Sequence, residues 1–154
     1  MKKTFAAVLA LCLLLCAAAC GEKAAADFSL EDCSRALLAS DAFTDLLSPI
    51  TAETAAGLYG IDASKLSEAQ VYCSTGATAE EIALFKAADE AAAKEIKAAC
   101  ETRIASQKES YESYVPEDVP KLEKAIVRMS GVYVVYVTAA DPAAAESILD
   151  GYIK

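Results

Sequence analysis

The chain has 154 residues, of which 55% are hydrophobic and 24% charged, with a net charge of −9 and neither histidine nor tryptophan. This length predicts one domain with one hydrophobic core. The acidic balance argues against nucleic acid as a partner and against electrostatic attraction to anionic lipid, because both need clustered lysine and arginine. No metal, nucleotide or catalytic motif is recognisable, so we predict no cofactor, no metal and no enzymatic activity.

The N-terminus has the features of a secretory signal peptide over residues 1–19. Two lysines precede the apolar stretch Phe5–Ala19, which is shorter than the roughly 20 residues that span a bilayer as a helix. Residues 18–20, Ala-Ala-Cys, resemble the cleavage site of bacterial lipoproteins, in which the cysteine receives a diacylglyceryl group. Such proteins usually have leucine where Ala17 stands, and an unlipidated secreted protein cut after residue 19 is the alternative. We expect lipidation of Cys20.

Two short helices are predicted next. Apolar residues recur at helical spacing over residues 29–40, with Ser29 as the N-cap. A second helix is predicted over residues 51–58, beginning at Thr51, with Gly60 at the left-handed position that ends it.

The middle of the chain predicts a β-hairpin followed by a long helix. Residues 69–73 alternate as in a strand, and residues 74–78 form a turn-rich loop. Residues 79–88 fit either a second strand or the start of one long helix, because a capping box and a period-two pattern overlap there. We favour the strand, with Asp89 as the N-cap of a helix over residues 90–111.

A second hairpin is predicted after that helix. Val115-Pro116 ends the helix, since a residue before proline is pushed out of the helical region, and a connection follows to Lys124. Residues 125–129 and 132–138 read as strands joined by the two-residue turn Ser130-Gly131.

These elements predict an α+β fold for residues 29–154. Asp141-Pro142 supplies the N-cap and first-turn proline of the last helix. The sheet is predicted to have four antiparallel strands, as two hairpins in ββαββα order, covered by helices and preceded by the two short ones. Residues 20–28 are the lipidated cysteine and a short tether.

With this order in hand, the chain resembles a known family. Residues 74–82, 114–117 and 131–134 resemble the DUF4358 family of small lipoproteins from Gram-positive anaerobes. The resemblance covers most of the chain from about Leu38 onward. It implies the fold and a location at the membrane, and it carries over no active site.

The three cysteines after Cys20 are candidates for a disulfide or a redox role. Cys33, Cys73 and Cys100 all lie on predicted apolar faces, where free cysteine behaves as a small hydrophobic residue. Their odd number outside the cytosol leaves one disulfide and one free thiol as the alternative. We favour three unpaired thiols that fill the core.

Other polar groups have simpler interpretations than catalysis. The hydroxyl-rich loop Ser74–Thr78 is more typical of a hairpin connection than of an anion site. The paired acids Glu31-Asp32, Glu80-Glu81 and Glu117-Asp118 lack a calcium or glycosidase pattern, so we expect a solvated surface.

Two tyrosines form the one candidate ligand patch. Tyr111 and Tyr114 lie beside Pro116 among acidic residues, an arrangement that suits a sugar or a peptide. Tyrosines that cap a core with the hydroxyl at the surface are the commoner case.

The function expected from the sequence is therefore that of an envelope lipoprotein. The protein is expected at the extracytoplasmic face of the cell membrane, held by a lipid on Cys20, with a non-enzymatic binding or scaffolding role. Its protein or small-molecule partner is unknown. The alternatives are an extracytoplasmic enzyme without a recognisable motif, such as a cell-wall-related hydrolase, and the unlipidated secreted protein.

Overall fold

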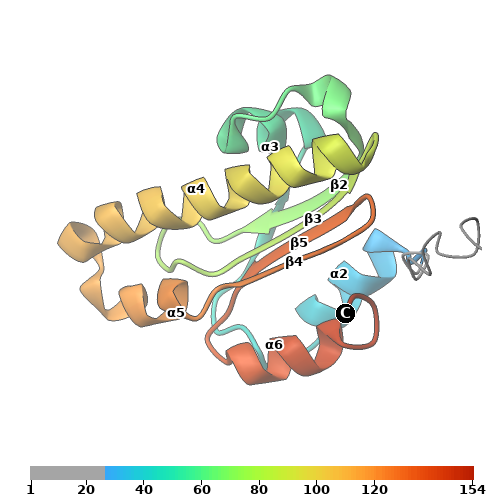
Figure 1. Ribbon diagram of the computed structural model, residues 1–154. Helices are drawn as coiled ribbons and strands as arrows, with labels where there is room; N and C mark the ends of the chain where they lie inside the picture. The colour runs from blue at the N-terminus through green and yellow to red at the C-terminus, as the bar shows by residue number, and fades with distance from the viewer. Residues whose placement is uncertain (1–26) are drawn as a thin grey trace, which may run out of the picture.

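A computed structural model describes residues 27–154, in which a β-sheet lies between two groups of helices (Figure 1). The predicted signal peptide, residues 1–19, and Cys20 lie outside the described residues. The helices, including the two 3₁₀ helices η2 and η3, are α2 (Leu30–Leu38), α3 (Ala52–Tyr59), η2 (Ala63–Lys65), α4 (Glu90–Tyr114), η3 (Pro116–Asp118), α5 (Val119–Glu123) and α6 (Pro142–Leu149). The strands are β1 (Ser48–Ile50), β2 (Leu66–Cys73), β3 (Glu81–Ala87), β4 (Ile126–Ser130) and β5 (Tyr133–Thr138).

The sheet has five antiparallel strands in the order β1-β2-β3-β5-β4. The predicted four-stranded sheet was therefore one strand short. The missing strand, β1, pairs with β2 from Ser48 opposite Cys73 to Ile50 opposite Val71. It has three residues and a central proline, so it lacks a readable period-two pattern, and proline is tolerated there because β1 is an edge strand. From β2 to α6 the order also differs from the predicted ββαββα, because η3 and α5 stand between α4 and β4.

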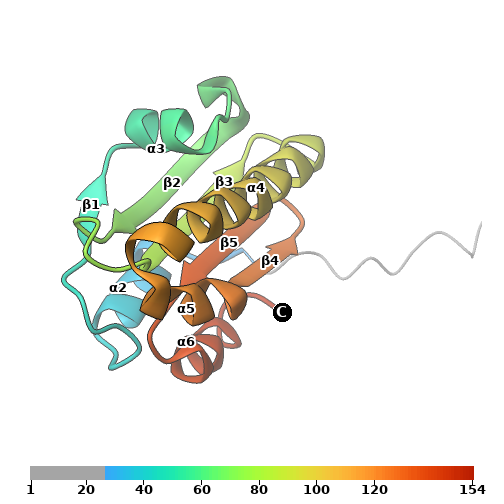
Figure 2. The ribbon, with the colours of Figure 1, turned by 90° about the vertical axis from the view of Figure 1, so that its left-hand side faces the viewer.

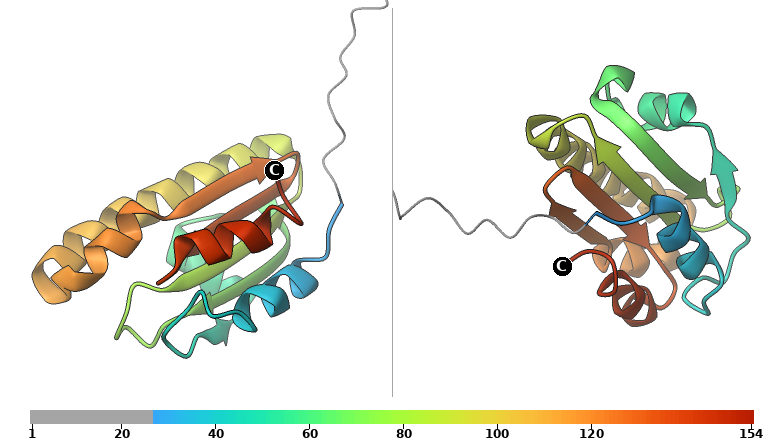
Figure 3. Two further views of the ribbon diagram at one scale, coloured as in Figure 1. Left: turned by 90° about the horizontal axis from the view of Figure 1, so that it is seen from below. Right: turned by 90° about the vertical axis from the view of Figure 1, so that its right-hand side faces the viewer.

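Helices cover both faces of the sheet and create two cores. On one face α2 and α6 pack on Ile82, Leu84 and Val135, and on the other α3 and α4 pack on Ala83 and Phe85 (Figures 2 and 3). The alternation of β3 between the two cores follows from the period of two in a strand. Because β3 is central and buried on both sides, residues 79–88 contribute a strand and not the start of a long helix.

The predicted N-caps of the four longer helices are confirmed, whereas α2 ends at Leu38, two residues before the predicted end. The side chains of Ser29, Thr51, Asp89 and Asp141 each accept a hydrogen bond from a backbone N–H in the first turn. Gly60 ends α3 at a φ of 66°, a left-handed conformation that glycine adopts without strain. Helix α4 runs to Tyr114, three residues beyond the predicted end, and stops before Pro116 as expected.

The second hairpin has its turn one residue later than predicted. Ser130 pairs with Tyr133, so the turn is Gly131-Val132 and not Ser130-Gly131. Gly131 has a φ of 56°, which places the left-handed residue inside the loop and leaves Ser130 extended in β4.

The three described cysteines are unpaired, as predicted. Their burial predicts that the thiols of the folded protein react slowly. Burial raises the pKa of Cys33 to about 11 and the pKa values of Cys73 and Cys100 to about 12. At pH 8 the thiolate fraction is then roughly a thousandth or less, so a thiol reagent should label the native protein slowly. In guanidinium chloride the thiols of Cys33, Cys73 and Cys100 should all react at once. Fewer than three would reveal a disulfide.

Candidate functional site

The predicted ligand patch lies at the end of α4, and its three residues have different surroundings. The Tyr111 hydroxyl donates a hydrogen bond to the carbonyl oxygen of Thr78 at 2.6 Å, so this half-buried ring ties α4 to the β2–β3 loop. Tyr114 is 79% exposed, and Pro116 is also exposed where η3 begins. The structure thus brings the three residues to one end of the molecule, with Tyr114 as the ring that is free for contact.

Three of the acids that were expected at the surface are buried, which corrects that prediction. Glu80 and Glu81 are each 1% exposed, and Asp118 is also buried. Glu80 immediately precedes β3 and Glu81 begins it. Adjacent residues of an extended chain point to opposite faces, so the two carboxylates enter different layers of the molecule.

The Glu80 carboxylate holds together segments that are distant in sequence. Its Oε2 accepts hydrogen bonds from the backbone N–H groups of Thr44 and Asp45, at 2.8 and 3.0 Å. Its Oε1 accepts from the Thr44 hydroxyl at 2.5 Å and from Lys121 Nζ at 3.0 Å. Lys121 also lies 3.0 Å from Asp118, which accepts a hydrogen bond from the backbone of Ala79. The cluster joins the α2–β1 loop, β3 and α5.

The charges of this cluster are mutually stabilised. Burial alone would raise the pKa of Glu80, but the hydrogen bonds from Thr44, Asp45 and Lys121 outweigh it and hold the pKa below its usual value. For Lys121, burial would lower the pKa, and the contacts with Glu80 and Asp118 raise it. Both groups are therefore charged at neutral pH, and neither is poised to exchange a proton with a substrate.

The Glu81 carboxylate is enclosed under α4 by a second network. Arg103 Nε and Nη2 donate to its two oxygens at 2.7–3.0 Å, and the Tyr59 hydroxyl donates at 2.5 Å. Gln107 adds a bond of 3.2 Å and accepts one of 2.9 Å from the Tyr136 hydroxyl. Every lone pair direction of Glu81 is occupied by protein, so this network fastens α3 and α4 to the sheet and has no open position for a ligand.

The β2–β3 loop uses its polar groups internally. The Ser74 hydroxyl donates to Asp45 at 2.5 Å and accepts from the backbone N–H groups of Gly76 and Thr78. The Thr78 hydroxyl also donates to Asp45, at 3.2 Å. A carboxylate of the same chain therefore occupies the position that an anion would take. The hairpin interpretation of residues 74–78 is confirmed.

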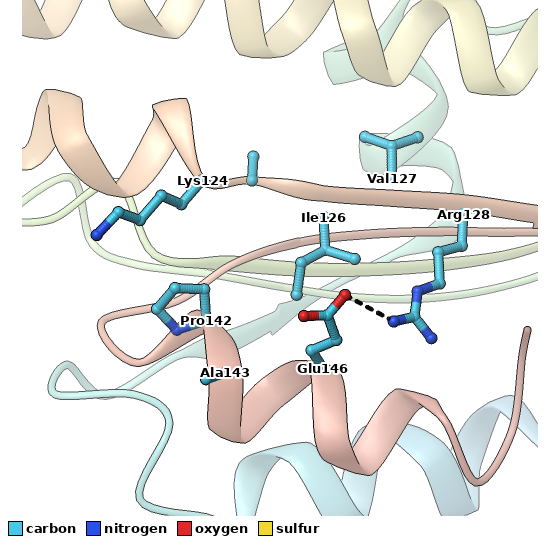
Figure 4. A pocket seen from close by; sticks show the side chains of 8 residues that line it. Lys124, Ile126, Val127, Arg128, Pro142, Ala143 and Glu146 are labelled. Atoms are coloured by element: carbon cyan, nitrogen blue, oxygen red, sulfur yellow. Dashed lines mark hydrogen bonds and ion pairs between the residues drawn. The ribbon is translucent and has the colours of Figure 1, made fainter.

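A groove lies between the edge strand β4 and helix α6 (Figure 4). It encloses about 500 Å³. Residues 124–128 form its first wall, with Lys124, Ile126 and Arg128 on the α6 side of the strand, and Pro142, Ala143 and Glu146 form the other wall. No sequence motif predicts this groove. The only feature of the sequence that marks the groove is the alternation of Lys124, Ile126 and Arg128. It places two cations, one on either side of an apolar residue, on one face of a strand.

The two cations of the groove differ in their partners. Arg128 contacts Glu146 at 3.0 Å, Asp150 at 2.7 Å and the carbonyl oxygen of Ile153 at 2.9 Å, so its charge is neutralised within the protein. Lys124 forms no ion pair with any residue of the range 27–154. The groove therefore offers one available ammonium group beside the apolar side chains of Ile126 and Pro142.

The Glu80 cluster gives a stability prediction. Glu80→Gln should lower the free energy of unfolding at pH 7 by about 1–3 kcal/mol, because Lys121 and the loop N–H groups lose a charged acceptor. The exposed Glu112→Gln is the matched control and should stay within about 0.5 kcal/mol of wild type. Urea denaturation of the three proteins measures these differences.

The pH dependence of that difference has a defined sign. The pKa of Glu80 is lower in the folded than in the unfolded protein. Its contribution to the free energy of unfolding is therefore complete above the unfolded-state pKa of about 4.3 and is lost as the pH falls through the folded-state pKa. The gap between wild type and Glu80→Gln should therefore narrow below about pH 4.3. A gap that widens on acidification would contradict the assigned bonds.

Comparison with known proteins places the chain in a family. Within residues 27–154 no helix is long and apolar enough to cross a bilayer, and no three potential metal ligands lie together. No curated protein and no solved structure matched the chain. Residues 42–139, which hold the whole sheet and helices α3 to α5, match the domain of unknown function DUF4358. This range exceeds half of the chain, and the protein therefore belongs to the DUF4358 family.

Proposed function

We propose that the protein is a lipoprotein held at the extracytoplasmic face of the cell membrane by a diacylglyceryl group on Cys20, and that it acts by binding a partner. The observation that carries this proposal is the sequence of residues 1–20, in which an apolar stretch ends in Ala-Ala-Cys. A net charge of −9 gives the chain no electrostatic attraction to anionic lipid, so a covalent lipid is the force that such a location needs.

The beginning of the folded domain supports a close attachment. The Phe28 ring packs against Tyr133, with 4.7 Å between ring centroids, and against Tyr152, with 5.8 Å. Asp27 accepts hydrogen bonds from Tyr133 and Lys86. Only residues 21–26 separate this point from Cys20, and six residues reach at most about 20 Å. An anchored domain would therefore keep the Phe28 end near the membrane surface.

The opposite end of the sheet would then face away from the membrane. Lys86 and Tyr133 stand at one end of β3 and β5, and Glu81 stands at the other end, beside the loop that contains Leu46. Leu46 is 82% exposed and Tyr114 is 79% exposed. Large apolar side chains with such exposure, on the side away from the lipid, suit contact with another molecule.

The chemistry of the buried groups favours binding over catalysis. The carboxylates of Glu80 and Glu81 are already engaged by protein donors, and the pKa values of the three described thiols are raised by burial. A nucleophile or general base needs the reverse, a group that is available and has its pKa near the working pH.

Modification of Cys20 is the decisive measurement. Two acyl chains, at about 0.8 kcal/mol per buried methylene, hold a protein stably on a membrane, whereas one chain binds only marginally. Mass spectrometry of the wild-type N-terminal peptide should therefore find diacylglyceryl on Cys20, and the protein should partition into detergent. A water-soluble protein that begins at an unmodified Cys20 would establish the secreted alternative.

The control variant is Cys20→Ala. It should lack the lipid and, once cleaved by another signal peptidase, enter the aqueous phase with its fold intact, because the cores contain no described residue before Phe28. An unchanged urea midpoint confirms that only the attachment was lost.

Orientation on the membrane gives a separate prediction. Two exposed positions can carry a fluorophore on an introduced cysteine. Ala63→Cys lies at the Phe28 end, because the carbonyl oxygen of nearby Lys65 accepts a hydrogen bond from Ala88, just after β3. Ser113→Cys lies at the far end of α4. A fluorophore at residue 63 should transfer energy to a dye in the bilayer more efficiently than one at residue 113. Equal transfer would show that the domain has no preferred orientation.

A further inference from the structure

The outer side of β4 carries backbone groups that no other part of the described chain uses. Ser130 and Tyr133 close a two-residue turn and form a hydrogen-bonded pair, and bonded and non-bonded pairs then alternate along the two strands. Val127 and Met129 therefore direct their N–H and C=O groups away from β5. No loop or turn hydrogen bond within residues 27–154 involves these four groups.

This open edge forms one wall of the groove against α6. Five consecutive residues, 124–128, line the groove, so its long direction follows the strand (Figure 4). Beside the backbone groups lie the apolar surfaces of Ile126 and Pro142, and at one end lies the Lys124 ammonium group without an ionic partner in the described residues. A strand edge, an apolar side-chain site and one free cation are what an extended acidic peptide requires.

We propose that the groove binds an extended peptide segment of another protein, which adds to β4 as a sixth strand and places a carboxylate on Lys124. The backbone of the segment pairs with Val127 and Met129. An apolar side chain of the segment fills the space over Ile126 and Pro142. This inference deepens the proposed binding function by naming the class of partner.

A second copy of the chain is a poorer occupant of the same edge. Two β4 strands paired antiparallel about a two-fold axis would bring their Phe28 ends to opposite ends of the joined sheet. Two anchored copies with tethers of at most about 20 Å would then have to reach one membrane from opposite directions. An edge lysine such as Lys124, which has no ionic partner in the described residues, is also a common device against self-association of edge strands.

The test uses the chain from residue 20 onward with Cys20→Ala, which retains all described residues and needs no lipid. The probe is a fluorescein-labelled nonapeptide of alternating threonine and valine whose two terminal threonines are replaced by glutamate, so that either strand direction brings a carboxylate to Lys124. The matched peptide has lysine at both ends. Fluorescence polarisation should show binding of the acidic peptide at least about fivefold tighter than the basic one, with the difference reduced by salt.

Two substitutions separate the backbone and charge contributions. Val127→Pro removes an outward N–H without removing a bond to β5, so it should weaken binding of the acidic peptide about tenfold. Val127→Thr keeps the N–H, and its affinity for the peptide should stay within about twofold of the wild-type value. Lys124→Glu should abolish the preference for the acidic peptide. If Val127→Pro unfolds the domain, N-methylation of alternate peptide residues gives the same information from the ligand side.

Several outcomes would overturn the proposal. The first is that neither peptide binds. The second is that neither Val127→Pro nor N-methylation of the peptide changes the affinity. The third is that the charge at position 124 has no effect on the affinity. Light scattering that finds a dimer, converted to a monomer by Val127→Pro, would assign the edge to a second copy instead. Because the tested chain carries no lipid, none of these results depends on whether Cys20 is modified.

Discussion

Two neighbouring carboxylates at the start of the central strand hold the layers of this molecule together. Glu80 and Glu81 point to opposite sides of the sheet, and each meets a partly buried cation, Lys121 on one side and Arg103 on the other. Each cation comes from a different helix, α5 or α4. Unpaired buried charges are costly, so the two helices must occupy their positions for the strand to be buried at all. The positions of α4 and α5 are thus tied to one dipeptide.

Local signals in the sequence were sufficient for most elements. Four N-caps, the glycine after α3 and the stop before Pro116 each act within a few residues, so each can be recognised without knowing the rest of the fold. The β3 strand was harder to predict, because the capping-box pattern at its start is also typical of a helix N-terminus. Its alternation proved decisive, since both faces of the strand meet a core. The turn Gly131-Val132 was misplaced by one residue because Ser130 is equally common in turns.

What could not be predicted depends on partners that are distant in sequence. The burial of Glu81 depends on Arg103, 22 residues away, and that of Glu80 depends on Lys121, 41 residues away. In a chain with 23 acidic residues nothing local distinguishes these two from exposed ones. The same applies to β1, which exists only because β2 offers it an edge, and to the groove, whose walls lie in β4 and α6. The hydrogen bond from the Tyr111 hydroxyl to Thr78 also joins residues that are 33 positions apart, so it was not foreseeable.

The layer formed by α2 and α6 lies outside residues 42–139, the range shared with the family. These helices contact each other and jointly cover Ile82, Leu84, Val135 and Val137. A chain trimmed to the family range would leave that side of the sheet bare to water. The boundary of sequence similarity is therefore not a boundary of the folding unit. A relative that shared only the central range would have to shield the same strand face with end segments of its own, and these could differ in sequence from α2 and α6 as long as they supplied an apolar face.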